Sequence, residues 1–217
     1  MMYVDWVAAG AVLPVKNQGG CGSCWAFGAI GAIEGNHFIK TGELVRLSEQ
    51  QMVDCEPDWY GCGGGWHNAA IDYAIDHPLA KNSDYPYRAA DQTCKHSSST
   101  AHVAVTQRKN VVNYSVAGMK AALDEGPVAI TVAAGNNWFR YYSSGILDDD
   151  SCPTRADHVI TAVGYGVEGG VEYLWALNQW GGNWGDNGYI KFAWKDGTIG
   201  QCGTLYRSYW ATTALAN

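Results

Sequence analysis

The sequence is poor in basic residues and has no long apolar run. It carries 14 Lys and Arg against 21 Asp and Glu, which gives a net charge of −7. Nucleic-acid binding needs a positive surface stripe, so the absence of any basic run disfavours that function. No stretch of about 18 apolar residues occurs, and we therefore expect no membrane span. The acidic balance suits an exported or acidic-compartment protein.

Internal repeats, low-complexity tracts and the marks of a leader peptide are also missing. The start, Met1 to Trp6, has neither a charged segment nor an apolar one. We therefore expect that any export signal is absent from this chain. At 217 residues the chain is longer than a modal domain of roughly 100–150 residues. Two lobes that share a cleft and one large domain both fit this length.

Seven cysteines are the most informative part of the composition. They are Cys21, Cys24, Cys55, Cys62, Cys94, Cys152 and Cys202. An odd number in an exported protein suggests disulfide pairs plus one free, reactive thiol. A zinc site would need two short cysteine pairs, and only Cys21 and Cys24 are so spaced. We therefore expect disulfides and neither a metal nor a cofactor. Buried free cysteines are the alternative for a reducing compartment.

The first half of the sequence has helical patterns, and the second half has strand patterns. The expected helices cover about 23–40, 49–55, 67–75 and 116–123, with a polar loop at 97–100. Gly42 should end the first helix, Ser48 should open the second through a capping box, and Ser115 should cap the last. Apolar or alternating runs predict strands at 128–132, 158–163, 173–177 and 189–192. This order indicates an α+β protein with a cleft at the seam.

The first expected helix contains Gly28, Gly31 and Gly35. Each glycine costs up to about 1 kcal/mol of helix propensity. Burial has to compensate for this cost, so we expect the helix to be central and tightly packed.

A glycine-rich turn followed by Cys24 opens this helix. A thiolate at the first turn lies against the positive end of the helix, which stabilises the anion. The unpaired N–H groups of that turn can bind a negative oxygen, as an oxyanion hole requires. Gln18 can supply a second donor through its side-chain amide. These features suit nucleophilic chemistry at Cys24, whereas a plain buried thiol is the structural alternative.

The segment Cys21-Gly22-Ser23-Cys24-Trp25 fits at every position the signature C-G-[SA]-C-[WY] of papain-like proteases. That family also has a His and an Asn about 130–150 residues downstream; His158 lies in this window and Asn178 slightly beyond it. Further segments resemble the family in its own order: Tyr3-Val4-Asp5-Trp6, Gly10-Ala11-Val12, Pro14-Val15-Lys16-Asn17-Gln18, Leu47-Ser48-Glu49-Gln50, Val53-Asp54-Cys55, Tyr85-Pro86-Tyr87, Asp157-His158, Val163-Gly164-Tyr165-Gly166, Trp180-Gly181, Trp184-Gly185 and Gly188-Tyr189. The chain therefore resembles the cathepsin L-like members of the papain family over nearly its whole length.

This resemblance implies a single peptidase domain over 1–217 with a two-lobed α+β fold. A helical left lobe would cover about 11–111. A right lobe with an antiparallel, barrel-like sheet would cover about 112–207, and both chain ends would cross between the lobes. The active-site cleft would lie between the two lobes.

The resemblance also implies a cysteine endopeptidase and assigns its parts. Cys24 would be the nucleophile, His158 the base that takes its proton, and Asn178 the residue that orients the imidazole. Gln18 would complete the oxyanion hole, and Trp180 would shield the His–Asn contact from water. Five other histidines compete with His158, and a lone histidine is usually a surface or a satisfied core group. These are His37, His67, His77, His96 and His102.

By the same resemblance, eleven residues would bind substrate: Gly22, Gly64, Gly65, Trp66, His67, Thr131, Ala156, Asp157, Val159, Trp180 and Arg207. The implied disulfides are Cys21–Cys62, Cys55–Cys94 and Cys152–Cys202, which leaves Cys24 free. Gly64 and Gly65 would pair with the substrate backbone. The segment between Cys55 and Cys62 is short, so no long insertion blocks the cleft, which favours an endopeptidase over a carboxydipeptidase.

Two positions depart from the family pattern. Gln179 stands where the family has the serine of an Asn-Ser-Trp triplet, and it should reshape the surroundings of the His–Asn contact. Arg207 stands at the floor of the main specificity pocket, where a large apolar residue is absent. A buried cation needs a counter-charge. The pocket should then tolerate Asp or Glu, or be narrowed by Arg207; an exposed Arg207 with ordinary apolar preference is the alternative.

The expected partners are protein and peptide substrates, an N-terminal propeptide that this chain does not contain, and cystatin-type or epoxide inhibitors. We expect a monomer that binds neither nucleic acid nor membranes, in a lysosomal, vacuolar or extracellular compartment. Asn113-Tyr114-Ser115 is an N-glycosylation sequon. A papain-like peptide ligase or transferase and a catalytically inactive binding homologue are the two alternatives.

Overall fold

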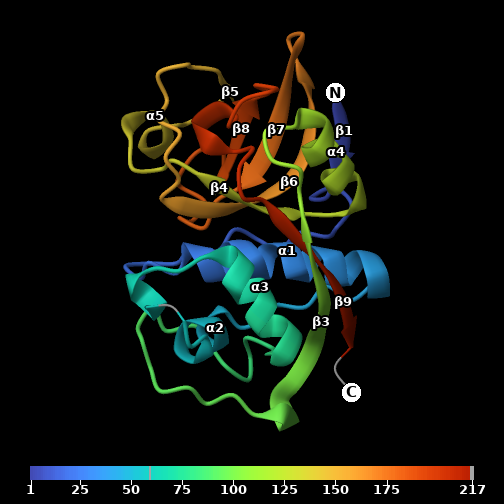
Figure 1. Cartoon of the computed structure of the whole chain (residues 1–217), viewed down its shortest axis with the longest axis vertical. Helices are drawn as coiled ribbons and strands as arrows, with labels where there is room; N and C mark the ends of the chain where they lie inside the picture. The colour runs from blue at the N-terminus through green and yellow to red at the C-terminus, as the bar shows by residue number, and fades with distance from the viewer. Residues whose placement is uncertain (59, 216–217) are drawn as a thin grey trace.

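The computed structural model describes residues 1–58 and 60–215 and has two lobes, one above the other in Figure 1. The helices are α1 (Cys24–Thr41), α2 (Glu49–Cys55), α3 (His67–Asp76), α4 (Val116–Glu125) and α5 (Asn137–Arg140), with 3-10 turns at Gly61–Gly63, Ser98–Thr100 and Gln201–Gly203. The strands are β1 (Met2–Asp5), β2 (Leu79–Ala80), β3 (Ala101–Asn110), β4 (Val128–Val132), β5 (Ile146–Leu147), β6 (His158–Glu168), β7 (Val171–Leu177), β8 (Tyr189–Ala193) and β9 (Tyr209–Leu215).

The helix ends follow the local chemistry of the sequence. Gly42 adopts a left-handed conformation after α1, and its N–H donates to the Phe38 carbonyl. The Ser48 hydroxyl accepts from the Gln51 N–H at the start of α2. The capping box is only half formed, because the Ser48 N–H donates to the Ala80 carbonyl. The Gln51 side chain instead accepts from the Ala80 N–H.

The described strands form one nine-stranded sheet. Its order is β2-β3-β9-β4-β6-β7-β8-β5, and β1 pairs with β6. Every pair is antiparallel except the parallel pair of β5 and β8. Within the described chain the sheet is an open path from β2 to β5, so the antiparallel sheet is confirmed but it does not close into a barrel.

Strand β3 corrects the expectation of a purely helical first half. Only Val103 and Val105 of its ten residues are buried. Its polar remainder gives little strand signal, because β3 is stabilised by pairing with β9 from Val103 opposite Leu215 to Asn110 opposite Tyr209. The polar loop expected just before it contains the 3-10 turn at Ser98–Thr100. Strand β1 and helix α5 were likewise not predicted.

Two separate apolar clusters fill the lobes. One cluster surrounds Trp25, Ile30 and Ile71 and extends to Val103 on β3. The other surrounds Phe139, Ile160 and Phe192 in the sheet-rich lobe. Helix α1 lies between them (Figure 1), and its Gly28 and Gly31 lie directly against β6. A Cβ on Gly31 would lie 2.4 Å from Thr161 Oγ1 on β6, so the expectation of a tightly packed central helix is confirmed.

Three disulfides join the chain: Cys21–Cys62, Cys55–Cys94 and Cys152–Cys202. These are the pairs that the resemblance implies. Cys24 is the free cysteine of the described chain. The first two disulfides lie in the helical lobe, and Cys152 and Cys202 belong to the core of the sheet-rich lobe.

Candidate active site

Cys24 is the first residue of α1 and is partly buried. The side chain of the N-cap residue, Ser23, does not cap the helix; its hydroxyl hydrogen-bonds to Tyr87 instead. The first turn therefore keeps N–H groups free of a side-chain cap. Burial raises the pKa of the Cys24 thiol to about 11, while backbone hydrogen bonds from Val159, Trp25 and Cys24 itself oppose that rise.

His158 is the first residue of β6, and its Nε2 lies 2.8 Å from Asn178 Oδ1. The same oxygen accepts from the Gln179 N–H at 2.9 Å. A backbone N–H can only donate, so this bond identifies the Asn178 atom as the oxygen of the amide. Nε2 of His158 consequently carries a proton, and Nδ1 of the neutral ring keeps its lone pair. Burial lowers the pKa of His158 to about 4, opposed by the Asn178 hydrogen bond and the Asp157 charge.

Aromatic rings cover this histidine. The Trp180 ring centroid lies 4.9 Å from that of His158, and the Phe139 centroid lies 5.8 Å away. Trp184 in turn packs against Phe139 with a centroid distance of 4.7 Å, which is a packing contact. Sequence reasoning missed Phe139, because it lies on α5, whose four residues show no helical period. Both His158 and Asn178 are buried.

Gln18 is buried, and its Nε2 donates to the Cys21 carbonyl at 2.8 Å. Its backbone N–H donates to the Gln179 carbonyl, which joins this loop to the segment that carries Asn178. Gly22 has to be glycine, because a Cβ there would lie 2.5 Å from the Cys62 carbonyl oxygen. These contacts fix the loop that precedes Cys24.

Gly64 and Gly65 follow the 3-10 turn and differ in their surroundings. A Cβ on Gly65 would lie 2.7 Å from the ring of Trp25, so this residue is required for close packing. Gly64 has φ of 120°, and a Cβ there would meet nothing within 4 Å; its N–H donates to the Gly61 carbonyl and its carbonyl accepts from the Tyr60 N–H. Trp66 occupies the N-cap position of α3 without a side-chain capping bond and is partly buried.

The other residues expected to bind substrate are held in different ways. Val159 is buried beside His158, and the Thr131 hydroxyl donates to the Tyr206 carbonyl at 2.6 Å. Ala156 is partly buried. Asp157 is exposed, and its carboxylate accepts from the N–H groups of Ala134 and Gly135.

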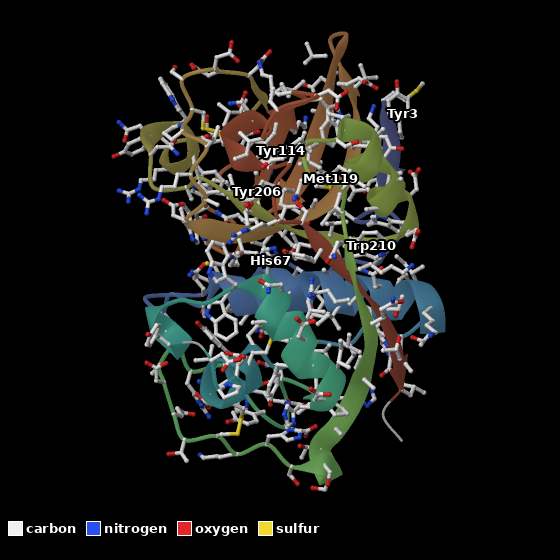
Figure 2. All side chains as sticks on the ribbon, in the orientation of Figure 1. Tyr3, His67, Tyr114, Met119, Tyr206 and Trp210 are labelled. Atoms are coloured by element: carbon white, nitrogen blue, oxygen red, sulfur yellow. A yellow bond between two sulfur atoms is a disulfide. The ribbon has the colours of Figure 1, made fainter. Side chains whose placement is uncertain are left out.

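Arg207 is exposed, so the expectation of a buried cation is wrong. Its guanidinium carbon lies 5.2 Å from the ring centroids of both Trp66 and Tyr206. Tyr206 stacks further on Tyr114, in the patch where Figure 2 labels both tyrosines near His67. His67 is buried, hydrogen-bonds through Nε2 to the Arg207 carbonyl, and has its pKa lowered to about 4 by burial. Planar rings thus hold the guanidinium at the surface.

The remaining histidines lie apart from Cys24. His37 is buried in α1 with Glu43 at 3.9 Å, and His102 hydrogen-bonds to the same Glu43. His77 and His96 have ring centroids 5.7 Å apart, and His96 hydrogen-bonds to Gln51. Within residues 1–58 and 60–215, neither pair hydrogen-bonds to the segment of His158 and Asn178 or stacks on it.

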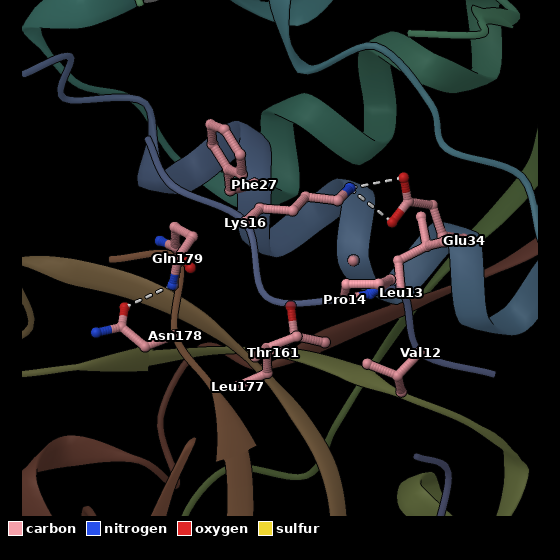
Figure 3. Close-up of a pocket in the computed structure, with 11 residues that line it drawn as sticks. Val12, Leu13, Pro14, Lys16, Phe27, Glu34, Thr161, Leu177, Asn178 and Gln179 are labelled. Atoms are coloured by element: carbon pink, nitrogen blue, oxygen red, sulfur yellow. Dashed lines mark hydrogen bonds and ion pairs between the residues drawn. The ribbon is translucent and has the colours of Figure 1, made fainter. Parts of the chain in front are cut away.

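A pocket lies behind Asn178, between α1 and the sheet-rich lobe (Figure 3). Its lining comprises Val12, Leu13, Pro14, Lys16, Phe27, Gly31, Glu34, Thr161, Leu177, Asn178 and Gln179. Lys16 is held by Glu34 at 2.7 Å and by Glu49 at 2.6 Å. Because two carboxylates share one buried ammonium, the polar lining is occupied by internal ion pairs. Over residues 1–58 and 60–215, no group of three or more His, Cys, Asp and Glu could hold a metal ion.

No helix among the described residues is long and apolar enough to cross a membrane.

Comparison with known proteins agrees with this geometry. The family described as "Papain family cysteine protease" matches residues 2–212. Digestive cysteine proteinase 2 of Homarus americanus is 44% identical over 88% of this chain, and chymopapain of Carica papaya is 41% identical over 98%. The chain spans only 60% and 61% of the lengths of these two relatives.

A solved structure of bromelain from Ananas comosus with the inhibitor E64 superposes with a TM-score of 0.90 at 39% identity, covering 96% of this chain and 97% of that one. The Carica candamarcensis protease CMS1MS2 with E-64 gives a TM-score of 0.89 at 36% identity, with the same coverage. The match over nearly the whole chain, together with this fold, shows that the chain belongs to the papain family of cysteine proteases.

Proposed function

We propose that this chain is a cysteine endopeptidase in which Cys24 attacks the peptide carbonyl and His158 moves the proton. His158 Nδ1 accepts the thiol proton, and the thiolate forms an acyl-enzyme while the imidazolium protonates the leaving amine. Water activated by the imidazole then releases the acid. The observation that carries the proposal is the orientation of Asn178, because its oxygen holds the Nε2 proton and so frees Nδ1 as the base.

The burial of both groups favours a paired charge over two separate ones. Burial raises the pKa of Cys24 and lowers that of His158, so it penalises a lone thiolate and a lone imidazolium. Moving the proton from one to the other creates opposite charges whose attraction offsets that penalty. Backbone hydrogen bonds to the thiol and the Asn178 bond to the ring stabilise the same charged pair.

The oxyanion of the tetrahedral intermediate needs two donors near Cys24. The first turn of α1 offers the Cys24 N–H, because no side chain caps the helix. The Gln18 amide offers the second donor, since one hydrogen of its Nε2 is bound by the Cys21 carbonyl and the other remains. The positive end of the α1 dipole further stabilises the negative charge of the oxyanion.

We further propose that substrate lies across the segment from Gly64 to Trp66, with its backbone paired to Gly64 and Gly65. The exposed guanidinium of Arg207, held over Trp66, then faces the side chain second before the scissile bond. An acidic side chain there can bind the guanidinium edge while an apolar one can contact the ring of Trp66. This arrangement supports tolerance of Asp and Glu without excluding apolar residues.

The setting of the enzyme is part of the same proposal. Three disulfides fit an oxidising compartment, and we propose a monomer that is exported or held in a lysosome or vacuole. The relatives are longer than this chain, which is compatible with synthesis as a zymogen with an N-terminal propeptide. The division near residue 111, where β3 ends and the second cluster begins at Val111, supports a helical and a sheet-rich lobe as one peptidase domain.

Active-site titration with E-64 under mild reduction at acidic pH tests the proposal. We expect one equivalent to attach to Cys24, as located by peptide mass mapping, and peptidase activity to be lost in proportion. Labelling of another residue, or none on folded protein, would reject Cys24 as the nucleophile and favour the inactive homologue. Product analysis with an added amine nucleophile separates hydrolysis from the transfer reaction of a ligase.

A further inference from the structure

Gln179 is buried with 5% of its surface exposed and contacts three segments of the candidate site. Its N–H donates to Asn178 Oδ1 at 2.9 Å, and its carbonyl accepts from the Gln18 N–H at 2.9 Å. Its side-chain Nε2 donates to the Val159 carbonyl at 2.7 Å. The backbone bonds are open to any residue, whereas the third bond depends on the glutamine side chain. Figure 3 shows Gln179 beside Asn178 at the pocket wall.

The Val159 carbonyl has no strand partner on the β7 side of the sheet, so it can accept from a side-chain donor. Strands β6 and β7 pair from Thr161 opposite Leu177 outward to Glu168 opposite Val171. After Leu177 the chain leaves the ladder, and the Asn178 N–H donates to Gly188. No β7 residue therefore stands opposite Val159, and the amide of Gln179 binds its carbonyl instead. A serine hydroxyl lies two bonds from Cα, whereas Nε2 lies four bonds away, so the longer side chain reaches across this gap.

Val159 is the point at which this bond acts on the reacting groups. It follows His158 directly in β6, and its backbone hydrogen-bonds to the Cys24 thiol. Its side chain packs against Gly28 of α1, where a Cβ would lie 2.4 Å from Val159 Cγ1. A shift of the Val159 backbone would thus move the histidine and its contact with the thiol together. On the opposite edge this stretch of β6 is paired with β4, with Thr131 opposite Val159 and Val132 opposite His158. On the β7 side the ladder ends at Thr161 opposite Leu177, so the Gln179 bond takes the place of a β7 partner there.

We propose that Gln179 is a positioning residue, whose side-chain bond to the Val159 carbonyl holds His158 in register with Cys24. The inference rests on the proposed function, because it assumes that the Cys24–His158 pair does the chemistry. It goes further in that it assigns a catalytic consequence to a residue that departs from the family pattern. Gln179 does not contact the reacting atoms itself and acts on them only through Val159 and Asn178.

Two variants distinguish the effect of losing the hydrogen-bond donor from the effect of changing the size of the side chain. Gln179→Met keeps the length and removes the donor. Gln179→Glu keeps the shape and can donate only while its carboxyl is protonated. Gln201→Met is the matched control, because Gln201 is also buried, with 3% exposed, and its Nε2 donates to the Asp149 carbonyl at 2.7 Å. Its Oε1 also accepts from the Asp149 N–H, and the pocket that it lines contains neither Cys24 nor His158. Each variant is compared with the wild type by the rate of E-64 inactivation, kcat/KM and urea unfolding.

We expect Gln179→Met to lower kcat/KM and the E-64 inactivation rate by about tenfold, the effect of one lost hydrogen bond. The fall should lie mainly in kcat, while KM changes little. Gln201→Met should lose similar stability and keep the wild-type inactivation rate. Gln179→Glu should resemble the wild type at low pH and approach Gln179→Met as the introduced carboxyl ionises, because a carboxylate repels the carbonyl it faces.

The pH comparison has to account for the charged groups nearby. Lys16 and Glu34 line the same pocket as Gln179, while Cys24, His158 and Asp157 lie on the side of the reacting pair. The ratio of the Gln179→Glu rate to the wild-type rate at each pH cancels the titration of these groups. A ratio that stays constant with pH, or a Gln179→Met enzyme with the wild-type inactivation rate, would overturn the inference. Failure of E-64 to label wild-type Cys24 would instead reject the proposed function.

Discussion

The amide of Asn178 decides which nitrogen of His158 carries a proton, and this gives a prediction about pH. The Asn178 hydrogen bond raises the pKa of His158 against the effect of burial. In Asn178→Ala the imidazolium should therefore lose its proton at lower pH, so the basic limb of the kcat/KM profile moves to lower pH. We also expect kcat/KM to fall by about tenfold or more.

Asn178→Asp provides the opposite test. The oxygen acceptor stays and a negative charge is added, so the imidazolium is stabilised and the basic limb should move to higher pH. Profiles of kcat/KM against pH for both variants measure the two shifts. Basic limbs that coincide with the wild type in both variants would show that Asn178 does not act on the ionisation of His158.

Arg207 gives a prediction about substrate preference. An exposed ion pair contributes about 0.2–1 kcal/mol, so Arg207→Ala should lower kcat/KM for a peptide with Glu second before the cut by up to about fivefold. The matching leucine peptide should change less. Arg207→Lys keeps the charge but loses the planar group between Trp66 and Tyr206, so it should retain only part of the effect. Equal changes for both peptides would leave ordinary apolar preference as the explanation.

The predictable residues of the site are those with a local signature. Cys24 is marked by the turn and helix start around it, and His158 by a strand-like run after it; the structure places His158 Nε2 at 2.8 Å from Asn178. Phe139 and the Gln179 bond to Val159 carry no such signature. Both depend on which segments meet in space, and sequence spacing does not encode that meeting.

Helix α1 shows how one element depends on a close contact with the sheet. Gly31→Ala should gain up to about 1 kcal/mol of helix propensity, yet its Cβ would lie 2.4 Å from Thr161 Oγ1. Overpacking of this kind costs about 1–3 kcal/mol, so the variant should be less stable than the wild type. Urea unfolding measures the difference in the free energy of unfolding.

A second substitution in β6 tests the cause. Thr161→Ala removes the hydroxyl and methyl that an alanine at position 31 would meet. The double variant should therefore be more stable than the sum of the two single effects allows, by an interaction energy within about 0.5–3 kcal/mol. Strict additivity would mean that α1 and β6 separate freely and that glycine is not required for the contact.

Strands β3 and β9 could not be predicted from the sequence. The alternating or apolar runs of β4, β6, β7 and β8 predicted those strands well, because one or both of their faces are buried. Strand β3 buries only two side chains in ten residues. Its partner is β9, about a hundred residues later in the chain, so the stabilising pairing is long-range and leaves no local pattern.

Over the whole molecule, these long-range strands connect the two lobes. Tyr209 at the start of β9 pairs with Ala129 of β4 in the sheet-rich lobe, while Ala211 packs in the core of the helical lobe. Strand β1 joins the beginning of the chain to β6. Strand β9 thus crosses from one lobe to the other, whereas β1 lies against the sheet-rich lobe. Helix α1 lies between the lobes (Figure 1) and carries Cys24, while His158 comes from β6.

The buried ion cluster at the junction predicts how the stability of the whole protein depends on pH. Burial raises the pKa of Glu34 to about 7, opposed by Lys16 and assisted by the charge of Glu49. The folded protein then holds a proton that the unfolded chain, with a pKa near 4.5, releases between those values. The protonated Glu34 therefore contributes fully to the free energy of unfolding below about pH 4.5. This contribution is lost as pH rises to 7, at up to about 1.4 kcal/mol per pH unit.

Glu34→Gln should remove this dependence, because an amide can still accept from Lys16 and from the Leu47 N–H but does not ionise. We expect the variant to unfold in urea with a flatter pH dependence between 4.5 and 7, so that its stability relative to the wild type improves as pH rises. Glu125→Gln is the matched control, since Glu125 pairs with Lys109 at the surface with 55% of its side chain exposed. Parallel pH curves for the wild type and Glu34→Gln would mean that Glu34 is already ionised throughout, and that the pocket behind Asn178 tolerates two carboxylates around one ammonium.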